Sequence, residues 1–380
     1  MMKVCIFTTV HRPFDVRVFH RQARTLARAG YDVTLLAHGD ENKTVQGIHI
    51  RTIARPKNRF FRLLSLFRFG FYCFREKANV YHFHDLECLP LGFLLKKVTG
   101  RAVIYDCHEN YPETAYERVW YPDWVKPLLA KLIARFEPAL AKQLDKVICV
   151  VADQKARFDA AGCDTALVRN VPRLEIFEQA LQIEAPVQNR LIYLGGQSVA
   201  RGARTLVDIM ADLSETHPDI KLLCLGPFNE PHVEAETKAY VKHRGLDHTI
   251  EYINMVPHEK VPEYVTTSLI GLIPWQPHQQ MLKMISPNKV FEYMACKIPI
   301  VASDLPSLKD IIVKSGAGVI VQADHVKAHA DAIRKLLSDP DLCHQYAKQG
   351  HQYVQTHHNW DIEAQKLLGV YQHIEKASSL

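Results

Sequence analysis

Short apolar runs alternate with helical stretches along the whole chain, and this alternation limits the fold more than any other feature. Lys3 to Val10 has the composition of a buried strand, a helix that Gly30 ends follows it, and a second apolar run comes next. Two strands joined in this way by one helix run parallel in a doubly wound sheet. The same order begins again at Arg190, with a strand, a glycine-rich loop and a helix. We therefore predict an α/β protein with parallel sheets.

The length of 380 residues exceeds that of a usual single domain, so the two runs of alternation predict two domains. We place a Rossmann-like domain at residues 1–172, a second at 187–359, and a terminal helix at 360–380. Residues 1–172 hold 27 Lys and Arg against 17 Asp and Glu, whereas the rest of the chain holds 20 against 24. This difference in charge suggests different partners for the two halves.

The composition, 47% hydrophobic and 23% charged, is typical of globular proteins with full cores. The N-terminal apolar run is too short for a signal peptide, and no uncharged stretch of 18 residues occurs. Nine cysteines, an odd number without a Cys-x-x-Cys pair, argue against a disulfide framework. We therefore expect a cytoplasmic protein, with the inner face of the cell membrane as a further location.

Polar side chains follow the first strand, where folds of this class bind ligands. They are His11, Asp15 and Arg17. No G-x-G-x-x-G is present at this point, which disfavours a dehydrogenase. A capped helix start with Arg17 in solvent explains the same residues without any ligand.

Two later strands of the first half also end in polar residues. His84 and Asp85 follow the run 80–83, and His108 and Glu109 follow the run 102–105. Since parallel strands deliver such residues to one edge of the sheet, they predict a binding cleft. His108 as a mere helix-capping residue is the alternative.

A metal site is the second interpretation of these strand ends. His82 and His84 share one face of a strand, and Asp85 and Glu87 follow closely. Histidines at a sheet edge more often bond to polar neighbours, so we predict no metal.

Residues 51–77 hold eight basic residues, one acidic residue and many Phe and Leu. This composition is typical of surfaces that bind anionic lipid headgroups. The basic residues do not share one helix face, so a helix that covers a sheet and extends its arginines to solvent explains the segment equally well. Nothing else in the sequence favours nucleic acid as a partner.

The second half offers two places for an anion. The loop from Gly195 to Gly202 allows close backbone approach, and Arg201 adds a fixed positive charge. Ser286 and Pro287 predict a helix start, with a capping serine and proline at the first helical position, and free N–H groups there suit a phosphate. An ordinary helix with Lys289 and Glu292 in solvent is the alternative.

Together these motifs resemble the family-4 glycosyltransferases, retaining enzymes of the GT-B fold, in which two Rossmann-like domains face a central cleft. The resemblance rests on Asp-x-His-Glu at 106–109, Arg201-Gly202, Ser-Pro-Asn-Lys-x-x-Glu at 286–292, and the helix from Trp360. Two positions depart from the family pattern: Met284 replaces a glutamate, and Gly196 replaces an arginine.

The resemblance implies a role for each candidate residue. His108, Arg201 and Lys289 would be catalytic. The residues that bind the donor would be Gly195, Gly196, Arg201, Ser286, Pro287, Asn288, Lys289, Val290 and Glu292. The residues on the acceptor side would be His11, Asp15, Arg17, His84, Asp85 and Glu109.

The implied reaction moves a sugar from a nucleoside-diphosphate sugar, UDP before GDP, to a saccharide or lipid-linked acceptor in surface polysaccharide or glycoconjugate assembly. Cationic side chains and helix N–H groups suffice for the leaving diphosphate, so we expect no metal and no other cofactor. A nucleotide-sugar epimerase of the same fold and a non-enzymatic sugar-binding protein are the alternatives.

Overall fold

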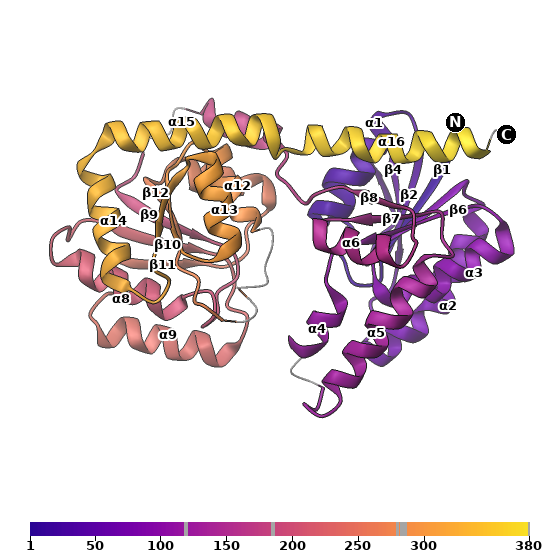
Figure 1. Ribbon diagram of the computed structural model, residues 1–380, viewed down its shortest axis with the longest axis horizontal. Helices are drawn as coiled ribbons and strands as arrows, with labels where there is room; N and C mark the ends of the chain where they lie inside the picture. Colours follow the sequence, from indigo (N-terminus) through magenta and orange to yellow (C-terminus); the bar gives the residue numbers. More distant parts are fainter. Residues whose placement is uncertain (118–120, 184–186, 279–280, 282–286, 379–380) are drawn as a thin grey trace. The chain divides into compact units, whose positions relative to one another are not determined.

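The computed structural model describes residues 1–380 apart from 118–120, 184–186, 279–280, 282–286 and 379–380. The chain forms two compact units (Figure 1), Met1–Asn170 with Asp361–Leu380, and Val171–Trp360. The second unit thus begins at Val171 and includes the helix α7 (Leu174–Leu181), whereas we placed the start of the second domain at residue 187.

Unit 1 contains an eight-stranded sheet of order β3-β4-β2-β1-β5-β6-β7-β8, parallel except for β3. Its elements are β1 (Lys3–Phe7), the π-helix η1 (Val16–Ala23), α1 (Arg24–Arg28), β2 (Asp32–His38), β3 (Lys43–Val45), β4 (Ile48–Ile53), α2 (Arg59–Glu76), β5 (Val80–Phe83), η2 (Leu86–Cys88), α3 (Leu89–Thr99), β6 (Ala102–Cys107), α4 (Tyr111–Glu117), α5 (Lys126–Ala141), β7 (Lys146–Cys149), α6 (Ala152–Ala160), β8 (Thr165–Leu167) and α16 (Trp360–Ser378).

Alternate strand residues of unit 1 point to opposite faces of its sheet. On one face Phe7, Phe83 and Tyr105 form a core with α2, α3, α5 and α6. On the other face His82 Nδ1 lies 2.8 Å from the hydroxyl of Tyr371 on α16. Glu363 of α16 is fully buried and accepts a hydrogen bond from the backbone N–H of Arg169 at 2.8 Å. The last helix is therefore a structural part of unit 1.

Unit 2 contains a six-stranded parallel sheet of order β11-β10-β9-β12-β13-β14. Its elements are α7, β9 (Arg190–Leu194), α8 (Ala203–Ser214), β10 (Lys221–Leu225), α9 (Pro231–His243), β11 (Ile250–Ile253), η3 (His258–Lys260), α10 (Val261–Thr266), β12 (Ile270–Ile273), α12 (Asn288–Ala295), β13 (Ile300–Ser303), α13 (Pro306–Ser315), β14 (Gly318–Val321), α14 (Val326–Ser338) and α15 (Pro340–His357).

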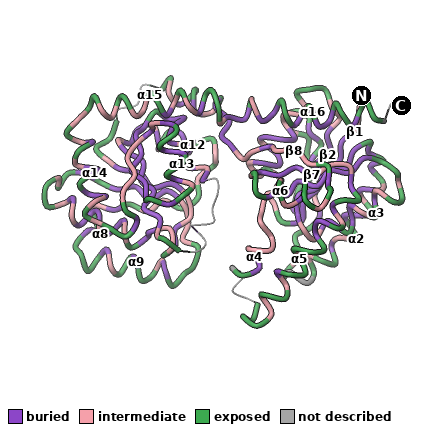
Figure 2. Tube along the Cα trace, in the orientation of Figure 1, coloured by how far each residue is buried: buried purple, intermediate pink, exposed green. Residues whose placement is uncertain are grey.

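The sheet of unit 2 has a separate core on each face. Tyr193 and Leu222 pack with α8 and α14, whereas Ile192 and Ile300 pack with α12, α13 and α15. Figure 2 shows the four inner strands of this sheet, β10, β9, β12 and β13, buried over most of their length. Near-continuous apolar runs of this kind are required where helices cover both faces of a parallel sheet.

Within the described ranges of the chain, no helix is both long enough and apolar enough to cross a lipid bilayer.

Candidate active site

Asp106 is the centre of a buried polar cluster at the carboxyl ends of β1, β5 and β6. Its two oxygens accept hydrogen bonds from Arg17 Nε at 3.0 Å and Nη2 at 2.8 Å, and Gln22 Nε2 lies 2.5 Å from Oδ2. Burial opposes the charge of Asp106, but the Arg17 guanidinium together with His108, His82 and His84 outweighs burial and holds the pKa of Asp106 well below its usual range. The π-helix η1 supplies both partners of Asp106, Arg17 and Gln22.

Two residues that we expected on the acceptor side belong to this buried cluster instead. Arg17 is only 5% exposed because it pairs with Asp106, so it does not extend into solvent. His84 is fully buried, its Nδ1 lies 3.8 Å from Asp106, and burial lowers its pKa well below its usual value. Both residues therefore belong to the buried part of the site, next to Asp106.

The structure brings together a different set of possible metal ligands from the set considered in the sequence. His82 and His84 converge on Asp106, with ligand atoms within 4.8 Å of one another, and not on Asp85 or Glu87. Both oxygens of Asp106 are already engaged by Arg17 and Gln22, and Tyr371 occupies His82 Nδ1. A cation at this point would lie beside the Arg17 guanidinium, whose positive charge opposes it.

His11 and His108 connect the loops after β1 and β6. Their Nε2 atoms lie 2.9 Å apart, so one ring donates a hydrogen bond and the other accepts it. His11 Nδ1 also lies 3.2 Å from Asp15. Burial opposes the charge of both His11 and Asp15. Their hydrogen bond and mutual attraction, with further contributions from nearby carboxylates and backbone N–H groups, together outweigh burial, so the pKa of His11 is raised and that of Asp15 is lowered.

His108 thus has both ring nitrogens turned to protein groups. Its Nε2 faces His11, and its buried Nδ1 lies 3.8 Å from Asp106. A sugar could hydrogen-bond to a nitrogen of this ring only after displacing one of these neighbours.

Asp85 fixes the loop that carries His11. Its Oδ2 accepts hydrogen bonds from Thr8 Oγ1 at 2.7 Å and from the backbone N–H groups of Thr9 and Val10 at 2.6 and 3.2 Å. Its Oδ1 lies 3.6 Å from His11 Nε2. Asp85 and Glu109 both line a groove beside this cluster.

In unit 2, two cations meet at the pair Gly195 and Gly196, directly after β9. Gly195 has a φ of +103°, and a Cβ there would lie 3.4 Å from Lys289 Nζ. Arg201 Nη1 donates a hydrogen bond to the Gly196 carbonyl oxygen at 3.3 Å, and a Cβ on Gly196 would lie 2.6 Å from Asn229 Oδ1. Glycine is therefore required at both positions for the cations to come this close.

Lys289 is a buried cation without a hydrogen-bond acceptor among the residues that the structure describes. It is 7% exposed, and its Nζ lies 3.9 Å from the centre of the Tyr193 ring and 5.4 Å from that of Trp275. Burial, and then the nearby Arg201, lower the pKa of Lys289 well below its usual value. A buried ammonium of this kind favours an anionic ligand.

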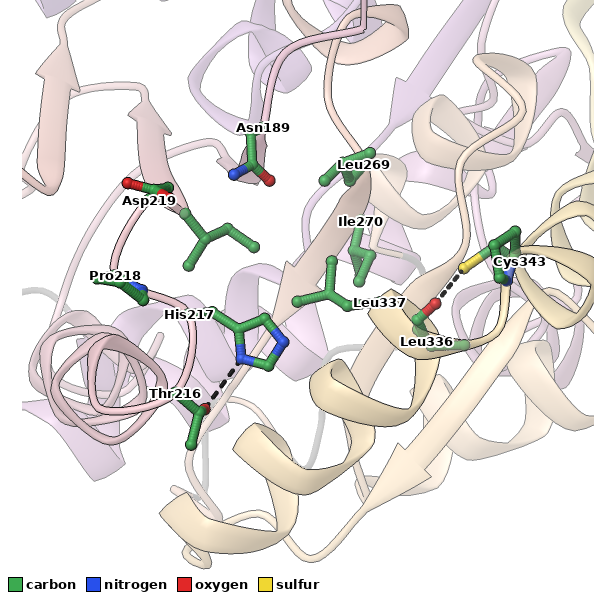
Figure 3. A pocket seen from close by; sticks show the side chains of 12 residues that line it. Asn189, Thr216, His217, Pro218, Asp219, Leu269, Ile270, Leu336, Leu337 and Cys343 are labelled. Carbon is green, nitrogen blue, oxygen red and sulfur yellow. Dashed lines mark hydrogen bonds between the residues drawn. The ribbon is translucent and has the colours of Figure 1, made fainter.

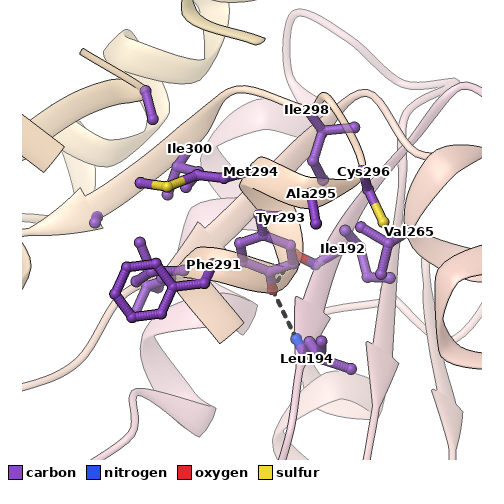
Figure 4. Close-up of a cluster of buried hydrophobic side chains, with 14 of the residues drawn as sticks. Ile192, Leu194, Val265, Phe291, Tyr293, Met294, Ala295, Cys296, Ile298 and Ile300 are labelled. Carbon is purple, nitrogen blue, oxygen red and sulfur yellow. Dashed lines mark hydrogen bonds between the residues drawn. The ribbon is translucent and has the colours of Figure 1, made fainter. Parts of the chain in front are cut away.

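Helix α12 places Lys289 beside the glycine loop because Tyr293 fastens the helix to β9. The Tyr293 hydroxyl accepts a hydrogen bond from the backbone N–H of Leu194 at 2.8 Å and donates one to the Ile192 carbonyl at 3.2 Å (Figure 4). Its ring lies over Gly271, where a Cβ would be 2.6 Å away. Glu292 is half-buried on the same helix.

The start of α12 differs from the prediction. The helix begins at Asn288, and Pro287 is its N-cap, because Pro287 has an extended backbone and its carbonyl accepts the Val290 N–H at 3.1 Å. The predicted cap, Ser286, and the departure at Met284 lie outside the described residues. Val290 offers nothing to a ligand, since its N–H is taken and its side chain is in the core. Asn288 has a buried Oδ1 that no described residue contacts by a hydrogen bond.

A cavity of about 530 Å³ in unit 2 lies away from these residues (Figure 3). Asn189, Ile220 and Ile270 line it, at the amino ends of β9, β10 and β12, whereas Gly195 follows the carboxyl end of β9. It is therefore not the site at which Lys289 and Arg201 meet.

Several residues of these clusters were not predicted from the sequence. Tyr371 and Gln22 contact the unit 1 cluster, Tyr193 and Trp275 lie beside Lys289, and Tyr293 fastens α12 to β9. Their sequence signal is that of ordinary core aromatics and helix polar residues, so only the fold identifies them.

Two family models match adjoining parts of the chain. The model of "Glycosyltransferase Family 4" matches residues 16–173, and that of "Glycosyl transferases group 1" matches residues 182–353.

Curated relatives and solved structures agree with these matches. Phosphatidyl-myo-inositol mannosyltransferase of Mycobacterium leprae is 23% identical over 79% of this chain and 75% of its own length. Spore coat protein SA of Bacillus subtilis is 24% identical, and its match spans 48% of each chain. The structure of Anabaena HepE in complex with UDP-glucose superposes with a TM-score of 0.72 over the full length of both chains, at 14% identity. The chain therefore belongs to the group 1 glycosyltransferases and has the GT-B fold.

Proposed function

We propose that this glycosyltransferase takes its sugar from a nucleoside-diphosphate sugar, with UDP as the favoured nucleotide, and passes it to a saccharide or lipid-linked acceptor. The observation that carries the proposal is the buried Lys289 ammonium beside Arg201 and the glycine loop. The likeness to HepE, whose structure contains UDP-glucose, supports uridine as the base.

The chemistry of the proposed step matches the charges of unit 2. Breaking the bond between the anomeric carbon and the diphosphate leaves negative charge on the departing oxygen. Lys289 and Arg201 are fixed cations at the same glycine pair, so they would stabilise this charge without rearrangement and without a metal. Glu292, half-buried on the same helix as Lys289, would accept hydrogen bonds from the ribose hydroxyls.

We propose retention of the anomeric configuration, which the resemblance to the family-4 motifs supports. The configuration of the first-formed product, read from the anomeric proton coupling by NMR, tests this point. An inverted product would contradict it.

The donor site is tested by Arg201→Ala, with Arg204→Ala as a matched control. Arg204 lies three residues further on, is exposed, and stacks on Tyr240 at 4.2 Å. Release of nucleoside diphosphate should fall by about 10²–10³-fold in the first variant and stay near wild type in the second. Equal activity of Arg201→Ala and wild type would overturn the assignment. Release without any acceptor would favour an epimerase or hydrolase.

We also propose that unit 1 docks on an anionic membrane surface. Helix α2 buries Phe69 and Cys73 but leaves Phe67 80% exposed and Phe71 61% exposed. The charge of the segment 51–77 is smaller than its composition implies, because Arg62 pairs with Glu87, which lies outside the segment.

Helix α5 extends the proposed docking surface. Four exposed side chains recur every fourth residue, and we name them the α5 stripe: Trp124, two residues before the helix begins, and Leu128, Leu132 and Phe136 within it. Exposed Lys131 and Arg135 lie on the same helix. A row of large apolar side chains beside basic ones suits the interface of an anionic bilayer.

A further inference from the structure

A groove of about 390 Å³ in unit 1 begins at the polar cluster and extends between helices α2, α4 and α5. The groove has a polar end and an apolar end. One end is formed by the loops after β1, β5 and β6, and the other by apolar side chains of the helices. A ligand that fills the groove would therefore need a polar part and an apolar part.

The polar end contains His11, Asp85, His108 and Glu109. Glu87 lies beside them and pairs with Arg62 of α2 at 3.0 Å. Three carboxylates outnumber one guanidinium, which is already paired, and the His11 imidazole, so a phosphate or other anion would be repelled. Hydroxyl groups, which donate hydrogen bonds to carboxylates, are the ligand chemistry that fits.

The apolar end contains Leu63 of α2, Ala115 of α4, and Leu129 and Ile133 of α5. Leu129 and Ile133 are one helical turn apart and half-buried, so they form a continuous apolar wall. The α5 stripe occupies the neighbouring face of the same helix, because Leu128 and Leu132 each precede one of these residues. An apolar chain could therefore pass from the exposed face of α5 into the groove along one helix.

We infer that this groove binds the acceptor, and that the acceptor is an amphiphile with an uncharged saccharide head and an apolar chain. The head lies among Asp85, Glu109 and the two histidines, and the chain lies along Leu129 and Ile133. The inference rests on the proposed function, since it names the acceptor of the transfer.

Alkyl glucosides of increasing chain length test the groove with the full-length protein, by calorimetry below the concentration at which they form micelles. We expect affinity to rise about four-fold for each CH₂ from hexyl to decyl glucoside, and methyl glucoside to bind too weakly to measure. Leu129→Asn with Ile133→Asn should remove the dependence on chain length. The control, Leu128→Asn with Leu132→Asn, changes the neighbouring face of the same helix and should retain it.

A labelling experiment covers the case in which the groove variant does not fold. Thr114 lines the groove, so the cysteine of Thr114→Cys should react with a maleimide and be protected by decyl glucoside but not by methyl glucoside. Absence of protection would overturn the inference, as would equal loss of chain-length dependence in the groove variant and its control.

Binding and consumption of the donor are measured separately from binding in the groove. Arg201→Ala should lose stabilisation by the nucleotide sugar and still bind decyl glucoside like wild type. A wild-type enzyme that turns over donor but shows no chain-length dependence would overturn the groove alone. An enzyme that binds decyl glucoside but never consumes donor would overturn the proposed function, and with it the groove as an acceptor site.

Discussion

At the scale of single residues, unit 2 keeps a cation where burial opposes it. Lys289 is enclosed by Tyr193 and Trp275 and is close to Arg201, and these surroundings lower its pKa. Such a residue destabilises the free protein and becomes favourable only when an anion arrives. Function and stability are thus opposed at this position.

We therefore expect Lys289→Met to raise the free energy of unfolding of the free protein, by about 1–3 kcal/mol near neutral pH. Because the folded-state pKa of Lys289 is below the unfolded value, wild-type stability should rise as the pH passes from the folded value towards about 10.4. The difference in free energy of unfolding between the variant and wild type should narrow as the pH rises over this range. Urea unfolding at pH 7 and pH 9.5 measures it, with the exposed Lys335→Met as control. A variant less stable than wild type at both pH values would contradict the account.

The pair His11 and Asp15 offers a second test at this scale, because Asp15 has two separable functions. It accepts hydrogen bonds from the Arg17 and Val18 N–H groups at 2.8 and 2.9 Å as the cap of η1, and it raises the pKa of His11. Asparagine preserves the cap but not the charge, whereas alanine removes both.

Asp15→Asn should lower the pKa of His11, followed by NMR of the imidazole, at little cost in stability near pH 8. Asp15→Ala should lose about 1 kcal/mol in addition. The folded pKa of His11 is raised and that of Asp15 is lowered, so the pair stabilises most between about pH 4 and 6.5, and the part due to His11 is lost as the pH rises through its folded pKa. An unchanged His11 titration in Asp15→Asn would disprove the coupling.

At the scale of helices and strands, the sequence predicts what depends on local pattern. The parallel strands follow from apolar runs, and the polar residues at their ends follow from strand direction. Helix α12 begins one residue later than predicted, because the proline at 287 suits both the N-cap and the first helical position. The edge strand β3 was not predicted, because a strand of three residues is too short to show a clear hydrophobic pattern.

Features that depend on tertiary contacts could not be predicted. Tyr371 contacts His82 from 289 positions away, and Arg17 is buried only because Asp106 lies beneath it. The α5 stripe was missed for a related reason. An exposed leucine and a buried leucine look alike in a sequence, so the apolar outer face of α5 could not be told from a face that packs in the core.

The α5 stripe gives the prediction at the element scale. Substituting Trp124, Leu128, Leu132 and Phe136 by serine should weaken binding to vesicles with anionic lipid by at least about ten-fold, because each side chain loses its transfer to the bilayer interface. The matched control replaces exposed Val313 and Met255 of unit 2 by serine. Sedimentation with vesicles at low and high salt measures the effect. Equal binding of variant and wild type would rule out α5 as the docking element.

At the scale of the whole molecule, the two compact units divide the proposed work. Lys289, Arg201 and the glycine loop belong to unit 2, whereas the groove and the α5 stripe belong to unit 1. The last helix makes unit 1 discontinuous in sequence, because it completes a unit that begins at Met1. Loss of the chain's end should therefore damage the unit that contains its beginning.

A chain that ends at Trp360 tests this arrangement. It lacks Leu367 and Tyr371, both fully buried, and leaves His82 without its hydroxyl partner. Burial of each such side chain contributes about 1.5–3 kcal/mol, so losing both removes a large share of the roughly 5–15 kcal/mol that stabilises a typical domain. Calorimetry should show the unfolding transition of unit 1 lost or far lower in temperature, and UDP should still raise the transition of unit 2 by mass action. Tyr371→Phe, which removes one hydrogen bond, should cost only about 1 kcal/mol. If the shortened chain instead loses the response to UDP and keeps the unit 1 transition, the division of the molecule described above is wrong.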